Sequence, residues 1–211
     1  MSSLIGVLGI ETTTPSFRAA LLRTARAVGL DPDHLATVIS FETGGSFSPS
    51  QENRAGSSAV GLIQFTQGAR DELGVSRSAL MAMSAEEQLE YVRRYFARKG
   101  FAPGKSRSLE DTYLAVFYPA AIGKSLGTVL FRKGDGVYEK NAGFDVAKKG
   151  YITVADVTAK IRGQYESGLQ RPRVKVPDGG TAPGAGAGGI GALLLALGTG
   201  VWFIFRSGKS R

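Results

Sequence analysis

Glu42 is the residue of this sequence whose type and placement could best support acid–base chemistry. It continues the apolar stripe of a predicted helix, because it follows Leu35, Val38 and Ile39 by seven, four and three positions. The segment 43–45 (TGG) then ends that helix. Partial burial and the negative end of the helix dipole would both raise the pKa of this carboxyl, which suits a general acid. On spacing alone, a glutamate that turns outward to solvent is an equal alternative.

Composition limits the other chemistries. The 211 residues include no cysteine and a single histidine, His34. Disulfide scaffolds, thiolate metal sites and cysteine nucleophiles are therefore excluded, and neither a histidine-based triad nor a multi-histidine metal site is expected. The net charge of +8 is uneven: residues 1–170 carry 20 basic and 17 acidic side chains (+3), and residues 171–211 carry 6 and 1 (+5). A body this mildly basic is not expected to bind nucleic acid.

The segment that follows Glu42 reads ETGGSFSPSQENRAGSSAVGLIQFT. Its small polar residues, glycines and proline predict a loop, and the apolar run over 59–65 predicts that a helix resumes there. This order of parts resembles the lysozyme-like soluble lytic transglycosylases, in which a catalytic glutamate at a helix end precedes a Gly-Leu-Met-Gln signature. Glu42 matches the acid, and residues 61–64 (GLIQ) match the signature with isoleucine in place of methionine.

Further along the chain, residues 114–123 (LAVFYPAAIG) resemble the Ala-Tyr-Asn-Ala-Gly motif of the same family. Tyr118 takes the place of the tyrosine, whereas Pro119 replaces the asparagine, a departure shared with the phage-type branch of these enzymes. Small or hydroxyl residues line the family's cleft at the positions that match Ser57 and Ser58. The resemblance therefore implies glycan contacts from Ser57, Ser58, Gln64, Phe65 and Tyr118.

The resemblance covers roughly residues 14–168 and implies both a fold and a reaction. The fold would be a mainly α, lysozyme-like domain. The reaction would be cleavage of the bond between N-acetylmuramic acid and N-acetylglucosamine in peptidoglycan. In the family, one acid protonates the glycosidic oxygen and then accepts the proton of the muramyl 6-hydroxyl, which gives a 1,6-anhydro product. No metal, nucleotide or other cofactor takes part.

Hydrolysis by paired carboxylates is the alternative chemistry, and it needs a second acid across the cleft. Glu52 is the nearby candidate in the loop after Glu42. A glutamate in such a loop, between Gln51 and Asn53, is also typical of a solvated surface. Spacing alone leaves both interpretations of Glu52 open.

Residues 145–156 have the outline of an EF-hand calcium loop. Asp145 stands at position 1, Gly150 at position 6 and Asp156 at position 12. Positions 3 and 5, which normally supply oxygen ligands, are Ala147 and Lys149. We therefore expect no calcium binding, and we expect one of the two lysines, at 148 or 149, to lie across the two aspartates and hold the turn by charge.

Helices are predicted by their start signals. These are Thr14-Pro15, Asp31-Pro32, Ser84-x-x-Glu87, Ser108-x-x-Asp111 and Thr153-x-x-Asp156. Residues 1–13 are expected to be a docked terminal segment, and 14–168 the transglycosylase domain. Proline and glycine predict a flexible linker over 169–184, and the uncharged residues 185–205 predict one transmembrane helix followed by a basic tail, 206–211.

The resemblance to the phage-type branch, together with the uncharged segment 185–205 and no evident export signal, implies a membrane-anchored, phage-encoded enzyme used for local cell-wall penetration or lysis. It would reside in the virion or the bacterial inner membrane with its domain facing the wall. Its partners would be peptidoglycan strands, the membrane through 185–205, and other virion or membrane proteins. The basic residues on the two flanks of 185–205 nearly balance, so they do not decide the orientation. The alternatives are a non-catalytic glycan-binding protein of the same fold and a membrane-disrupting, holin-like protein.

Overall fold

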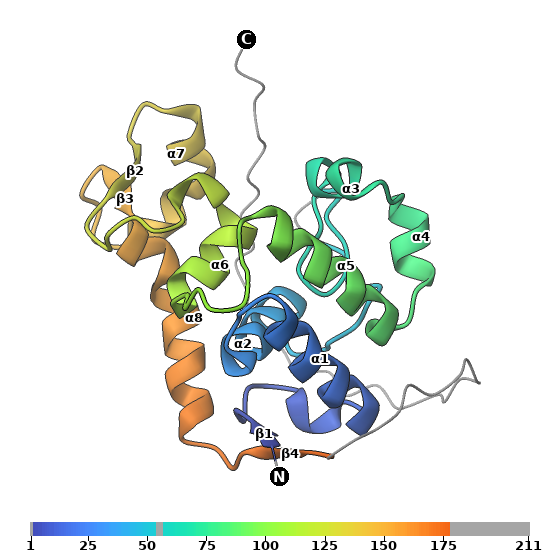
Figure 1. Ribbon diagram of the computed structural model, residues 1–211. Helices are drawn as coiled ribbons and strands as arrows, with labels where there is room; N and C mark the ends of the chain where they lie inside the picture. The colour runs from blue at the N-terminus through green and yellow to red at the C-terminus, as the bar shows by residue number, and fades with distance from the viewer. Residues whose placement is uncertain (1, 54–56, 178–211) are drawn as a thin grey trace.

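The computed structural model describes residues 2–53 and 57–177 and is mainly helical, as the sequence predicts (Figure 1). Its α-helices are α1 (Pro15–Ala27), α2 (Pro32–Thr43), α3 (Gln67–Leu73), α4 (Arg77–Ala82), α5 (Ala85–Arg98), α6 (Leu109–Phe117), α7 (Gly136–Asn141) and α8 (Val154–Leu169). Single 3-10 turns span Ile10–Thr12, Pro119–Ala121 and Ala142–Phe144. The strands β1 (Ser2–Leu4) and β4 (Val174–Val176) form one antiparallel pair, and β2 (Val129–Arg132) and β3 (Tyr151–Thr153) form another.

The predicted helix starts are confirmed by side-chain caps. A hydroxyl or carboxylate at each start accepts a backbone N–H of the first turn. The capping residues are Thr14, Asp31, Ser84, Ser108 and Thr153. Two of these starts are full capping boxes, in which Glu87 and Asp156 reach back to the capping residue.

Helix α2 lies at the centre of the body, in contact with α1, α6 and α8 (Figure 1). Its predicted apolar stripe is fully enclosed, because Leu35, Val38 and Ile39 are each 0% exposed. The helix ends as predicted, with Gly44 in the left-handed conformation at φ 61°. The core of the protein therefore fixes the helix that carries Glu42.

The helix predicted over residues 59–65 is wrong. This segment forms a turn closed by bridges from Val60 to Glu52 and to Phe65, and α3 begins only at Gln67. Gly61 (φ 87°) and Gln64 (φ 51°) take left-handed backbone conformations that an α-helix does not contain. A Cβ atom at position 61 would lie 2.5 Å from Oε1 of Gln88, so this turn requires glycine there.

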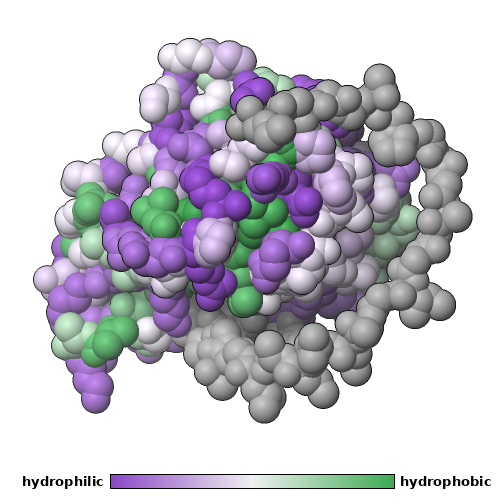
Figure 2. Space-filling view, turned by 90° about the horizontal axis from the view of Figure 1, so that it is seen from below, coloured by the Kyte–Doolittle hydropathy of each residue, from purple (hydrophilic) through white to green (hydrophobic). Residues whose placement is uncertain are grey.

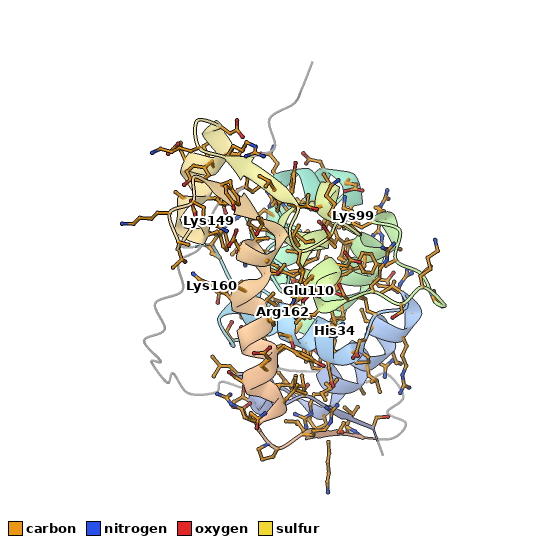
Figure 3. All side chains as sticks on the ribbon, turned by 90° about the vertical axis from the view of Figure 1, so that its left-hand side faces the viewer. His34, Lys99, Glu110, Lys149, Lys160 and Arg162 are labelled. Carbon is orange, nitrogen blue, oxygen red and sulfur yellow. The ribbon has the colours of Figure 1, made fainter. Side chains whose placement is uncertain are left out.

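A small lobe lies at one end of α6 and α8 and consists of β2, β3, α7 and the residues between them (Figure 1). It has its own hydrophobic cluster, which includes Leu114, Phe131, Phe144, Ile152 and Val157. Lower down, an ion pair between Glu110 and Arg162 joins α6 to α8, as the side view shows (Figure 3). The small lobe therefore packs against α6, the helix that contacts α2.

The two ends of the described chain are held together. Leu4 and Ile5 are 0% exposed, which agrees with a docked terminal segment. The linker predicted from residue 169 begins too early, because α8 ends at Leu169 and Val174–Val176 pairs with β1. Arg173 supports this pairing by contacting the Asp33 carboxylate at 2.8 Å. The face that these strands share is mostly hydrophilic, with a small hydrophobic area near its centre (Figure 2).

The remainder of the predicted linker from 178, the transmembrane segment 185–205 and the tail 206–211 lie outside the described residues. Within 2–53 and 57–177, none of the helices has the length and apolar character that crossing a bilayer requires.

A fragment ending at residue 170 is expected to melt several degrees below one ending at residue 177. The shorter fragment loses β4, including the buried Val176, and the contact between Arg173 and Asp33. Exposing the core beneath that strand costs about 2–4 kcal/mol. Thermal unfolding of the two fragments, followed by circular dichroism, measures the difference. Equal melting temperatures would show that β4 adds nothing to the stability of the body.

Candidate active site

Glu42 lies near the C-terminal end of α2, with its side chain in the interior rather than turned outward. Its residue is 8% exposed, so the carboxyl reaches the edge of the core and is largely dehydrated. Burial raises the pKa of Glu42 from 4.5 to about 8, and no hydrogen bond from the described residues opposes this shift. At neutral pH the group therefore holds its proton, which is the form that a general acid needs.

Two buried tyrosines lie close enough to Glu42 to respond to its charge. Burial, and next the charge of Glu42, hold the pKa of Tyr113 well above its usual value. The pKa of Tyr95 is raised by burial and by the charges of Glu72 and Glu42. The Tyr95 hydroxyl donates to the Ala115 carbonyl at 2.7 Å, which fixes the ring between α5 and α6. Among residues 2–53 and 57–177, no cation lies where its charge lowers the pKa of Glu42, and burial is the cause of the shift.

A small hollow next to Tyr95 brings in the turn over residues 59–66. Its lining residues are Ile63, Gln64, Phe65, Thr66, Ala69, Tyr95 and Val116. Phe65 is 1% exposed and packs edge-on against Tyr95, with 6.2 Å between the ring centroids. Of the predicted glycan contacts, Gln64 and Phe65 therefore lie together beside Tyr95, and Tyr95 is near enough to Glu42 for the charge of that carboxyl to raise its pKa.

Gln64 presents an unused hydrogen-bond acceptor at this hollow. Its Nε2 donates to the carbonyls of Gln51 (3.0 Å) and Gly61 (3.1 Å), and these two acceptors fix which way the amide points. The remaining atom, Oε1, is buried and has no hydrogen-bond partner among residues 2–53 and 57–177. Because an unpaired buried acceptor is costly and the hollow has a volume of about 10 Å³, this atom can accept from a water molecule or from a single hydroxyl or N–H that enters the hollow.

Three of the predicted contacts do not line the hollow. The Arg70 guanidinium donates a hydrogen bond to the Ser58 carbonyl at 2.8 Å. Ser57, the preceding residue, is partly exposed. Tyr118 follows α6 and packs against Phe131 of the small lobe, with 5.3 Å between the ring centroids. On α6 it is Tyr113, one and a half turns earlier, that lies near Glu42.

Glu52, the alternative second acid, has a partner on the surface. Its carboxylate lies 2.9 Å from the Arg77 guanidinium, and its side chain is 56% exposed. An exposed ion pair of this kind needs no catalytic role. Elsewhere in residues 2–53 and 57–177, no three carboxylate or imidazole side chains gather where they could hold a metal ion.

Gln88 and Arg70 hold the turn over residues 59–66 in place, and sequence analysis did not identify either residue. Gln88 of α5 is 0% exposed, and it donates to the carbonyls of Pro49 and Leu80 at 2.6 Å each while accepting from the Leu62 N–H at 3.1 Å. Arg70 of α3, 7% exposed, also donates to the Phe65 carbonyl at 2.8 Å. Glutamine and arginine on helices are usually solvated, so only their contacts identify these two residues as supports of the turn.

No protein-family description matches this chain, and no curated protein is significantly similar to it.

Proposed function

We propose that this protein is a peptidoglycan lytic transglycosylase with a lysozyme-like domain. The observation that carries the proposal is the buried carboxyl of Glu42, whose pKa burial raises to about 8. The turn that carries residues 61–64 supports it, because this turn lines a hollow together with Tyr95, whose pKa is raised in part by the charge of Glu42.

In the proposed reaction, Glu42 donates its proton to the glycosidic oxygen. The bond between this oxygen and C1 of the N-acetylmuramic acid breaks, and the oxygen leaves as a hydroxyl of N-acetylglucosamine. The resulting carboxylate then accepts the proton of the muramyl 6-hydroxyl, whose oxygen closes the 1,6-anhydro ring. Glu42 thus gives up one proton and takes one back in each reaction, so no second acid is needed. Gln64 Oε1 would accept a hydrogen bond from a hydroxyl or amide N–H of the sugar and so orient it.

The proposed setting is a phage-encoded protein that opens the wall locally, anchored in a virion or inner membrane through residues 185–205. The support for the anchor is the uncharged sequence of that segment. Strand β4 ends at Val176, beside the N-terminal strand, so the anchor would join the domain at that end. The enzyme domain would face the wall.

The direct test is to incubate the full chain, kept in a mild non-ionic detergent, with purified sacculi and to analyse the soluble products by mass spectrometry. Muropeptides ending in 1,6-anhydro-muramic acid support the proposal. Products ending in reducing muramic acid would show hydrolysis instead. Binding to sacculi without release of products would favour the non-catalytic, glycan-binding alternative.

The rate is expected to fall as the pH rises through about 8. Below that pH the folded protein holds the Glu42 proton, and above it the acid form declines about tenfold per pH unit. Initial rates of product release at low substrate concentration, measured from pH 6 to 10, give the profile. A rate that starts to fall near pH 5 would mean that Glu42 is ionised at neutral pH and is not the proton donor.

A further inference from the structure

The loop over residues 145–156 keeps the backbone of a calcium-binding loop. Asp145, at position 1, is 4% exposed and accepts from the backbone N–H groups of Lys149 (2.8 Å) and Gly150 (2.7 Å), and from the Tyr138 hydroxyl (2.9 Å). Gly150, at position 6, has φ 78°, the left-handed turn that an EF-hand requires of glycine there. Strand β3 follows and pairs with β2, and Asp156, at position 12, closes the first turn of α8.

A side chain of the loop itself supplies positive charge to these carboxylates. The Lys149 ammonium lies 2.9 Å and 2.7 Å from the two oxygens of Asp156, and its nitrogen is 4.8 Å from the centre of the Tyr151 ring. Lys149 is labelled in the small lobe in Figure 3. Oδ2 of Asp156 also accepts from the backbone N–H and the hydroxyl of Thr153 at 2.7 Å each. The Asp156 carboxylate is thus held from two sides, by the ammonium and by the start of α8.

The charge states agree with this arrangement. The hydrogen bond to Asp156 raises the pKa of Lys149, so the ammonium is retained. Burial opposes ionisation of Asp156, but the hydrogen bonds from Lys149 and Thr153 outweigh it and lower its pKa. The same balance holds for Asp145, where the two backbone N–H groups and Tyr138 outweigh burial.

We propose that the Lys149 ammonium permanently occupies the cation position of an EF-hand-type loop, so that this protein carries a latent calcium site filled by its own side chain. Lys149 stands at position 5, where such loops place an oxygen ligand, and its tip reaches the carboxylate that would bind calcium in a bidentate manner. A tethered cation needs no free ion and cannot be removed by a chelator.

The consequence is that the small lobe keeps its shape at any calcium concentration. The loop joins Phe144 to Ile152, and both side chains belong to the hydrophobic cluster that covers Leu114 of α6. Helix α6 also carries Tyr113, so the built-in cation stabilises a wall of the candidate active site. The inference itself rests on the loop geometry and does not depend on the proposed enzymatic activity.

The first test removes the ammonium alone. Lys149→Gln removes the charge and leaves a polar side chain one atom shorter, and it should lower the melting temperature of the full chain by several degrees, equally in calcium and in chelator. Lys148→Gln is the matched control, since Lys148 is the neighbouring residue of the same loop and is exposed. The control should melt like the wild-type protein. Equal melting temperatures for the two variants would overturn the proposal.

The second test restores the missing ligands. In the double variant Ala147→Asp with Lys149→Asp, positions 3 and 5 regain carboxylates, so we expect destabilisation in chelator and recovery in 10 mM calcium. Terbium luminescence excited through Tyr151, the adjacent residue, should report binding in the same variant. The control Ala147→Asp with Lys148→Asp makes the same change of charge but leaves position 5 occupied by lysine, so it should not respond.

The third test is whether calcium changes the melting temperature of the wild-type protein. Its melting curves in 10 mM calcium and in chelator should overlap, because the ammonium already occupies the site. A calcium-dependent rise of several degrees in the wild-type protein would overturn the inference, and so would a double variant that binds neither calcium nor terbium. Failure to cleave peptidoglycan would refute the proposed function without affecting these results.

Discussion

Replacing Glu42 by glutamine is expected to lower the rate of muropeptide release at least 100-fold, with no loss of fold. General acid–base catalysis typically contributes 10²- to 10⁴-fold, and the amide keeps the size of the carboxyl but has no proton to transfer. The measurement is the initial rate of product release from sacculi by wild-type and variant full chains at pH 7. A variant that retains more than about a tenth of the wild-type rate would exclude Glu42 as the acid.

The same variant should be more stable than the wild-type protein, and the difference should depend on pH. Between pH 4.5 and 8 the folded protein holds a proton on Glu42 that the unfolded chain has lost. The wild-type free energy of unfolding therefore falls by about 1.4 kcal/mol per pH unit over this range through this one group. Glutamine does not titrate, so the variant should melt well above the wild-type protein at pH 8 and close to it near pH 4.

Glu52→Gln is the matched control for both measurements. The chemical change is identical, but Glu52 is exposed and paired with Arg77. We expect near wild-type product release, because a surface ion pair contributes at most about 1 kcal/mol to stability and nothing to proton transfer. A loss of activity comparable to that of Glu42→Gln would instead establish paired-carboxylate chemistry.

The features that sequence predicted well are those decided by neighbouring residues. Capping residues such as Thr14 and Ser84 act on backbone groups three residues away, so their effect can be read without knowing the fold. The stripe that buries Glu42 follows from helical periodicity in the same way. That a lysine at 148 or 149 would pair with aspartates of the same short loop was predictable, and the structure gives the contact as Lys149 with Asp156 rather than with both aspartates.

The features that sequence did not predict depend on residues far apart in the chain. The run over 59–65 has the composition of a helix, but Gln88, 27 positions after Gly61, holds it as a turn. The place of Tyr113 near Glu42, which the sequence did not indicate, is set by how α6 packs against α2. Strand β4 lies in a proline-containing segment typical of a linker, and only its pairing with residues 2–4 gives it structure.

Gln88 should therefore be among the most sensitive positions of the protein, although it has no place in the chemistry. Gln88→Leu keeps roughly the size of the side chain but removes its hydrogen bonds to the Pro49 and Leu80 carbonyls and from the Leu62 N–H. The Leu80 carbonyl keeps the Met83 N–H as a partner, whereas the Pro49 carbonyl and the Leu62 N–H lose the bonds that the amide supplies. Each buried group left unpaired costs about 1–3 kcal/mol, so we expect a loss of about 3 kcal/mol or more.

Gln88→Glu should be at least as damaging, because it places a carboxylate oxygen where the amide nitrogen now donates to two carbonyl oxygens at 2.6 Å. Urea unfolding of the full chain measures both variants, and Gln67→Glu, an exposed position at the start of α3, is the control for the change from amide to acid. Because Gly61 and Gln64 share the turn that Gln88 holds, product release should fall together with stability. A Gln88 variant that unfolds at the wild-type midpoint would show that the turn is held by its other contacts, with Arg70 and Phe65 as the next candidates.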